Sequence, residues 1–86
     1  MKVRLPTPLI EYTGGLREVE ANGDTLDDLL RDLDQRYPGI RFRMLDEQDQ
    51  IRAHIKLFVN AELGRSLESR LNKQDIVIIV AALSGG

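Results

Sequence analysis

Apolar and polar residues alternate along the chain in a way that predicts strands at both ends and one main helix between them. Strand-like alternation runs through residues 2–12 and again through 16–20, and the turn signal at 13–15 predicts that these two strands form a hairpin. Pro6 and Pro8 lie inside the first strand. Because proline has no N–H to donate to a neighbouring strand, we expect this strand to be distorted there.

The main helix is predicted to begin after Thr25 and to end at Pro38-Gly39. Thr25 can cap its first turn, and Asp28 three residues later approximates a capping box. Four leucines with helical spacing form one buried stripe: Leu26, Leu29, Leu30 and Leu33.

The second half of the chain predicts a minor helical turn at 40–45, a strand at 55–59 and a last strand at 76–83, with an irregular stretch around Leu67 and Leu71. A single helix on one face of a mixed sheet of four to five strands is an α+β roll. The first and last strands are expected to pair in parallel at its centre, because the helix supplies part of the crossover between them.

Composition restricts the function classes further. The 86 residues make one domain, and the net charge of −2 comes from interspersed acids and bases, without the basic stripe that nucleic acids or anionic membranes require. The absence of cysteine excludes disulfides, thiolate metal sites and a cysteine nucleophile. No signal-peptide pattern is present, and the longest apolar run, Ile76–Leu83, is far shorter than the roughly 20 residues of a membrane span, so we expect a cytoplasmic protein.

Several segments together resemble the MoaD/ThiS family of ubiquitin-like sulfur carriers, which includes the small subunit of molybdopterin synthase. They are the helix start Thr25–Leu30 with its end at Tyr37–Gly39, the strand Lys56–Asn60, the turn at Asp75 before an apolar strand, and the pair Gly85-Gly86. The resemblance covers nearly the whole chain and implies a β-grasp domain over 1–83 with a flexible, reactive tail at 84–86.

Two details refine this resemblance. The opening Val3–Leu9 with its Gly14-Gly15 turn is similar to a longer branch of the family, which includes carriers used in cysteine synthesis. Ala61 and Gln74 stand where the family usually has glycine, which affects two turns and leaves the terminal chemistry untouched.

The resemblance implies that the chemistry takes place on the main-chain carboxylate of Gly86. An ATP-dependent activating enzyme, an adenylyltransferase of the ubiquitin-activating type, would adenylate this carboxylate, and sulfur transfer would convert it to a thiocarboxylate. Ser84 and Gly85 would be recognised in the partner's channel, where glycine lets backbone approach closely because it has no Cβ. The chain has no glycine-rich phosphate loop of its own, so we expect a protein cosubstrate that is not an enzyme and binds no cofactor, with ATP used by the partner.

Strand parity predicts a docking surface beside the tail. Ile55, Leu57 and Val59 form one apolar side of their strand, whereas Phe58 points the other way. We therefore expect an apolar patch on the sheet face opposite the helix, made of Phe58, Leu63, Ile78 and Val80. The alternative is that one of the loops 46–52 and 61–72 covers these side chains.

The predicted function is a sulfur carrier for cofactor biosynthesis. Three acceptors fit: the large subunit of molybdopterin synthase, which is placed first, thiazole synthase, and a cysteine synthase. The alternatives are a ubiquitin-like protein modifier conjugated through Gly86 and a non-catalytic β-grasp binding module. The lone His54 is expected to be solvated, and the helix carboxylates Asp27, Asp28, Asp32 and Asp34 to be solvated helix surface without a metal.

Overall fold

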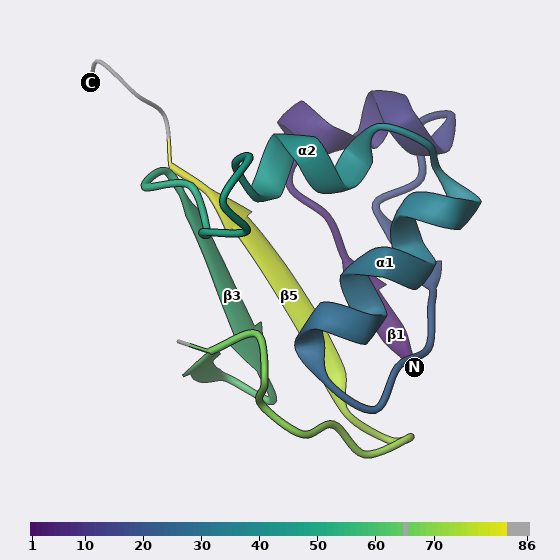
Figure 1. Cartoon of the computed structure of the whole chain (residues 1–86). Coiled ribbons are helices and arrows are strands. Elements are labelled where there is room, and N and C mark those ends of the chain that lie inside the picture. The colour runs from purple at the N-terminus through teal and green to yellow at the C-terminus, as the bar shows by residue number, and fades with distance from the viewer. Residues whose placement is uncertain (65, 83–86) are drawn as a thin grey trace.

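The computed structural model describes residues 1–64 and 66–82, which form a five-stranded mixed sheet with its helices on one face (Figure 1). The strand order is β2-β1-β5-β3-β4. The strands are β1 (Lys2–Arg4), β2 (Glu18–Glu20), β3 (Ile55–Val59), β4 (Glu62–Gly64) and β5 (Ile76–Ala81). The predicted parallel pairing of the first and last strands is confirmed, since β1 lies parallel to β5 while the other neighbours are antiparallel.

The main helix, α1 (Leu26–Arg36), follows the prediction closely. The Thr25 hydroxyl oxygen accepts a hydrogen bond from the Asp28 backbone N–H at 3.2 Å, which confirms the cap. All four leucines of the predicted stripe are fully buried, and each such side chain contributes about 2 kcal/mol by leaving water. Gly39, at a φ of 96°, turns the chain into the short α2 (Ile40–Met44), the predicted minor helical element.

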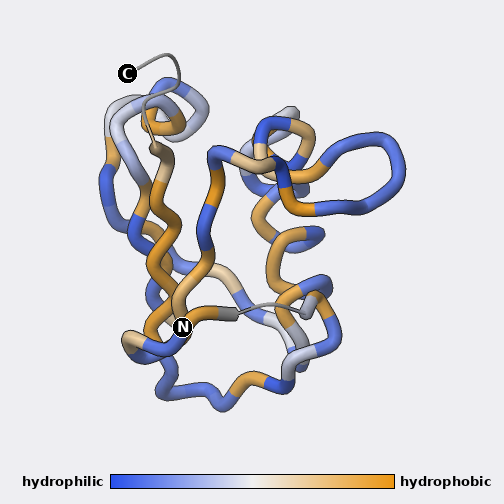
Figure 2. Tube along the Cα trace, turned by 90° about the vertical axis from the view of Figure 1, so that its left-hand side faces the viewer, coloured by the Kyte–Doolittle hydropathy of each residue, from blue (hydrophilic) through white to orange (hydrophobic). Residues whose placement is uncertain are grey.

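The core lies between these helices and the inner face of the sheet. Alternate strand residues point into it and are buried: Val3, Val19, Ile55, Leu57, Val77 and Ile79. In Figure 2, β5 is a nearly continuous hydrophobic run, while the loops around the domain are largely hydrophilic. The strand is apolar on both of its faces, as the sequence indicated, but only one face is covered by helices.

The prediction of a strand over 2–12 is wrong beyond Arg4. Residues Thr7–Thr13 form the 3-10 helix η1, which begins after an extended Pro6 and carries a proline in its first turn. Proline suits that position because its φ is already close to helical, and because its missing N–H would have no acceptor in the first turn. The apolar residues that suggested alternation are both buried, but in different elements: Leu5 lies just after β1, where its N–H donates to the Arg17 carbonyl oxygen at 2.7 Å, and Leu9 lies inside η1.

The strand β4 was not predicted, and it forms because the chain reverses tightly after β3. Asn60 and Ala61 take positive φ values of 50° and 71°. The Asn60 side chain donates to Asp75 Oδ1 at 2.7 Å and accepts from the Ile76 backbone N–H at 2.9 Å, so the turn is tied to the start of β5. The last strand ends at Ala81, two residues before the predicted end, and Leu83 lies outside the described residues.

Candidate partner-binding site

The reactive tail that the sequence predicts, Ser84, Gly85 and Gly86, lies outside the described residues, and so does the boundary at 83 between domain and tail. The last described residue is Ala82, whose backbone N–H donates to the His54 carbonyl oxygen at 2.7 Å. This bond lies just beyond the end of β5 and just before the start of β3. Ala82 therefore lies at the end of the sheet where β5 finishes and β3 begins (Figure 1).

The four residues predicted to dock a partner lie together on the outer face of the sheet. Phe58 is the cross-strand neighbour of Ile78 on one side and of Leu63 on the other, and directly paired residues share a face. Val80 follows Ile78 on the same face, opposite Lys56. We call Phe58, Leu63, Ile78 and Val80 the open-face patch.

The patch is accessible to a partner. Val80 is 41% exposed and Leu63 is 43% exposed, while Phe58 and Ile78 are half-buried by their neighbours. The described residues of the loops 46–52 and 61–72 therefore do not bury Val80 and Leu63, contrary to the alternative considered for them. A contiguous apolar surface of this kind favours a protein partner.

A charged region borders the patch on the same face. Arg4 lies beside Ile78 in the sheet, and Glu18 lies beside Arg4, at 3.3 Å between Arg4 Nε and Glu18 Oε1. Lys56 adds a further cation next to Val80. The outer face is thus apolar at the open-face patch and charged over β1 and β2 and at Lys56 of β3, a division that resembles the core and rim of an interface.

Three of the four carboxylates named on α1, those of Asp27, Asp32 and Asp34, make structural contacts. Asp34 Oδ1 accepts the backbone N–H groups of Gly39 and Arg41, at 3.1 and 3.2 Å. The N–H of Asn22 lowers the pKa of Asp32, against the effect of partial burial and together with Arg36. Residues 1–64 and 66–82 contain no group of three side chains placed to hold a metal ion.

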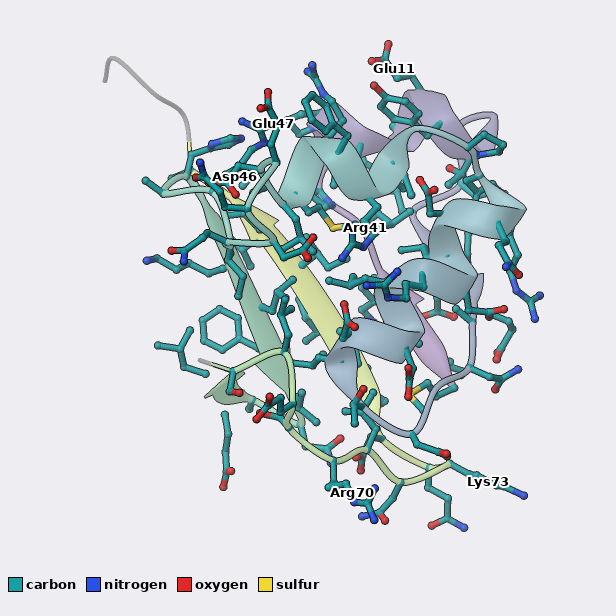
Figure 3. All side chains as sticks on the ribbon, viewed as in Figure 1. Glu11, Arg41, Asp46, Glu47, Arg70 and Lys73 are labelled. Carbon is teal, nitrogen blue, oxygen red and sulfur yellow. The ribbon has the colours of Figure 1, made fainter. Side chains whose placement is uncertain are left out.

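An ion-pair network around Arg41 is a feature that sequence reasoning missed. Arg41 Nη2 lies 3.2 Å from Asp27 Oδ1 and 3.0 Å from Asp49 Oδ1, so it links the start of α1 to the 46–50 loop (Figure 3). Partial burial opposes ionisation of Asp27, but hydrogen bonds from Arg31 and Arg41 outweigh it and lower the pKa of this carboxyl. No local pattern indicates these pairs, because 14 and 8 residues separate the partners.

The lone histidine lies at the surface, as expected. His54 contributes its backbone carbonyl to the bond that holds Ala82. Among the helices of the described residues, none is both long enough and apolar enough to cross a membrane.

A five-stranded mixed sheet with parallel central strands and one main helix on a single face is a ubiquitin-like β-grasp fold, which confirms the predicted fold class. Within this class the chain belongs to the ThiS family, whose sequence model matches residues 3–86. The match extends through Gly85 and Gly86. The resemblance to the MoaD/ThiS family is therefore confirmed.

Individual relatives show which members of the family this chain is similar to. The chain is 36% identical over 89 residues to sulfur carrier protein CysO of Mycobacterium tuberculosis, covering 98% of this chain and 96% of the relative. A chain of the Amycolatopsis orientalis BexX/CysO complex superimposes with a TM-score of 0.90 at 33% identity, over 99% of this chain and 98% of that one. SAMP1 of Haloferax volcanii, a small archaeal modifier protein, superimposes with a TM-score of 0.80 at 27% identity, over 100% of this chain and 98% of that one.

Proposed function

We propose that this chain is a sulfur carrier of the CysO kind, which carries sulfur as a thiocarboxylate on Gly86. The observation that supports this most is the 36% identity to a sulfur carrier protein over 98% of the chain. The family match that runs through Gly85-Gly86 supports the site. The chain then acts as a protein cosubstrate whose partners perform the catalysis.

In the proposed cycle, a carboxylate oxygen of Gly86 attacks the α-phosphate of ATP on the activating enzyme and displaces pyrophosphate. Sulfide from a donating partner then attacks the carbonyl carbon of the Gly86 adenylate. A C–S bond forms, the C–O bond to phosphate breaks with release of AMP, and the terminus becomes a thiocarboxylate. The role of this chain is to present the terminal carboxylate without obstruction, and paired glycines suit that role because backbone without Cβ can enter a narrow channel.

A cysteine-synthase-type enzyme is the acceptor that we propose. The similarity to CysO and the opening segment with Pro6 and Pro8, typical of the longer branch, both support it. The placing of molybdopterin synthase first among the acceptors finds no support in these relatives. Thiazole synthase is supported only by the match to the ThiS family.

Docking in this proposal uses the open-face patch together with the tail. The patch lies on the strands that lead to the tail, since Ile78 and Val80 belong to β5. A partner that binds Phe58, Leu63, Ile78 and Val80 therefore has the tail's starting point beside its own surface. The BexX/CysO complex supports a partner of this general kind, because it pairs a similar chain with a second protein.

Mass spectrometry of the intact chain tests the proposal. After incubation with its activating enzyme, ATP and a sulfide donor, the chain should gain the mass of one sulfur replacing one oxygen. A variant lacking Gly86 should stay unchanged in mass and unfold at the same denaturant concentration, because Gly86 lies five residues past the end of β5. If the shortened chain still acquires sulfur, Gly86 is not the site.

A protein modifier is the second candidate function, and the similarity to SAMP1 favours it. Such a chain would use the same activated Gly86 to form an amide bond with a lysine amine of another protein, with release of AMP. Cell extracts would then contain covalent adducts of higher mass that disappear when Gly86 is deleted. If cellular function survives loss of both glycines, the chain is instead a binding module without terminal chemistry.

A further inference from the structure

A hollow of about 320 Å³ lies beside His54, whose carbonyl oxygen holds Ala82, and none of the four residues of the open-face patch lines it. Four side chains line it: Phe42 and Arg43 from α2, and Arg52 and His54 from the segment that leads into β3. The hydrogen bond from the Ala82 N–H to the His54 carbonyl oxygen places Ala82, the last described residue, next to the hollow. Any partner that draws the tail into its active site therefore comes close to this hollow.

Arg52 and Phe42 form one wall of the hollow and contact each other. The Arg52 guanidinium carbon lies 4.8 Å from the centre of the Phe42 ring, a cation–π distance, and Arg52 Nε donates to the Phe42 carbonyl oxygen at 2.9 Å. The Arg52 backbone N–H also donates to the Met44 carbonyl at 2.9 Å. These three contacts hold the arginine in one place, so it is preorganised for a ligand and loses little rotamer freedom on binding.

The chemistry of the lining favours an anion. Two guanidinium groups, an imidazole and an aromatic face line the hollow, and no carboxylate from the described residues does so. An acidic residue of the neighbouring 46–50 loop, Asp46, accepts the backbone N–H groups of Gln48 and Gln50 through Oδ1, at 2.8 and 3.0 Å. The Gln50 and Gln48 N–H groups, together with the charge of Arg52, lower the pKa of this carboxyl. Because the Asp46 carboxylate is held by hydrogen bonds within its own loop, a carboxylate from a partner can pair with Arg43 and Arg52.

Phe42 gives a second reason to expect a ligand. It is 56% exposed, the largest exposed fraction among the exposed large hydrophobic residues of the described chain. A solvent-exposed aromatic ring stacked with arginine is typical of interface anchors, in which Arg and aromatic residues are enriched. The ring and the guanidinium would together cover a partner's carboxylate and its aliphatic stem.

We infer that this hollow is a second docking point, next to the tail, for an acidic segment of the activating enzyme. The inference rests on the proposed function, because it assumes that such an enzyme receives the tail. The activating enzyme is the partner we commit to, since every copy of a carrier must engage it before sulfur can be loaded. Arg43 and Arg52 pair with a carboxylate of that segment, while the open-face patch supplies the apolar contact.

Reversal of one charge tests the inference. The full chain carrying Arg43→Glu is compared with wild type in ATP–pyrophosphate exchange by the activating enzyme of its own organism. Arg43 is exposed, so the domain should fold normally. We expect KM for the chain to rise about tenfold with kcat unchanged, and the difference to shrink at high salt, as for a charge at the rim of an interface. Arg43→Lys should restore most of the affinity.

The matched control is Lys73→Glu, which changes the net charge by the same amount. Lys73 is exposed and lies at the end of the molecule opposite Asp46 and Glu47 (Figure 3). Its KM should stay within about twofold of wild type, because a distant exposed charge is screened by salt. Equal effects of the two variants would show a net-charge effect only and would overturn the docking point.

Two further outcomes separate this inference from the proposed function. If wild type supports exchange and Arg43→Glu has the same KM, the docking point is overturned while the carrier function stands. If wild type itself supports no exchange, the proposed function fails and this inference fails with it. Phe42→Ala provides an independent check, since removing the ring should also raise KM without affecting kcat.

Discussion

The inner and outer faces of β3 and β5 are built from alternate residues of the same two strands, and they differ sharply in exposure. Leu57 is fully buried against the helices, whereas its neighbour Phe58 is only half-buried on the outer face. In the same way Ile79 is 2% exposed and the adjacent Val80 is 41% exposed. Both faces are apolar here, so hydrophobicity alone does not separate the residues that stabilise the fold from those that remain exposed.

This contrast indicates why the outer residues are apolar. On the inner face, an apolar side chain stabilises the fold by leaving water. On the outer face of β1 and β2, Lys2, Arg4, Glu18 and Glu20 show that the sheet accepts charged residues. The open-face patch therefore does not owe its composition to the needs of the sheet, and a partner that covers it is the physical reason we favour.

Leu57→Ala tests the inner face and should have the largest effect. The side chain is 0% exposed, so its truncation leaves a cavity in the core and should lower the free energy of unfolding by about 3 kcal/mol. Urea denaturation followed by circular dichroism measures this loss. A cost below about 1 kcal/mol would contradict the assignment of this face to the core.

Val80→Asp tests the outer face of the adjoining strand. The residue is 41% exposed and lies opposite Lys56, whose charge can offset the new carboxylate. We expect the free energy of unfolding to change by less than about 1 kcal/mol, while affinity for the activating enzyme falls by at least about tenfold, because a charge is forced into an apolar contact. Titration calorimetry provides the affinity, and unchanged binding would exclude the open-face patch as a docking surface.

Sequence reasoning located the inner and outer faces because short-range periodicity encodes them. The four leucines of α1, the cap at Thr25 and the bounds of β3 were all predicted, and the alternation in β3 and β5 assigned the open-face patch correctly to one face. The chemistry on Gly86 came from resemblance to a family, since a main-chain carboxylate has no side-chain pattern. It lies outside the described residues and stays a prediction.

The missed features depend on contacts between distant residues or on short elements. Leu5 and Leu9 fit strand alternation in the sequence, and only the structure shows that β1 ends at Arg4 and that Leu9 is buried from η1 instead. The three residues of β4 are too few to show a period. The hollow beside the tail combines Phe42 with Arg52 and His54, ten and twelve positions later, and such a pairing becomes visible only after α2 packs beside the start of β3.

Ala61→Gly tests the turn that leads from β3 to the outer-face residue Leu63, and it should have the smallest effect on the free energy of unfolding. Ala61 takes a φ of 71° in the turn between β3 and β4, a left-handed conformation that costs an L-residue about 1 kcal/mol and glycine almost nothing. Part of the gain is lost to the greater freedom of glycine in the unfolded chain, so the free energy of unfolding should rise by about 0.5 kcal/mol. Glycine can adopt the same turn, so Leu63 should stay beside Phe58 and binding to the activating enzyme should not change.

The matched control for this substitution is Ala53→Gly. Ala53 is also exposed but has no positive φ, so glycine there should lower the free energy of unfolding by a few tenths of a kcal/mol to about 1 kcal/mol. Opposite signs for the two substitutions would confirm that the turn is strained, and denaturant titration of both variants side by side resolves the sign. If Ala61→Gly destabilises the domain as Ala53→Gly does, the turn stores no strain. The arrangement of Leu63 beside Phe58 would then be held by the Asn60–Asp75 hydrogen bond and by strand pairing alone.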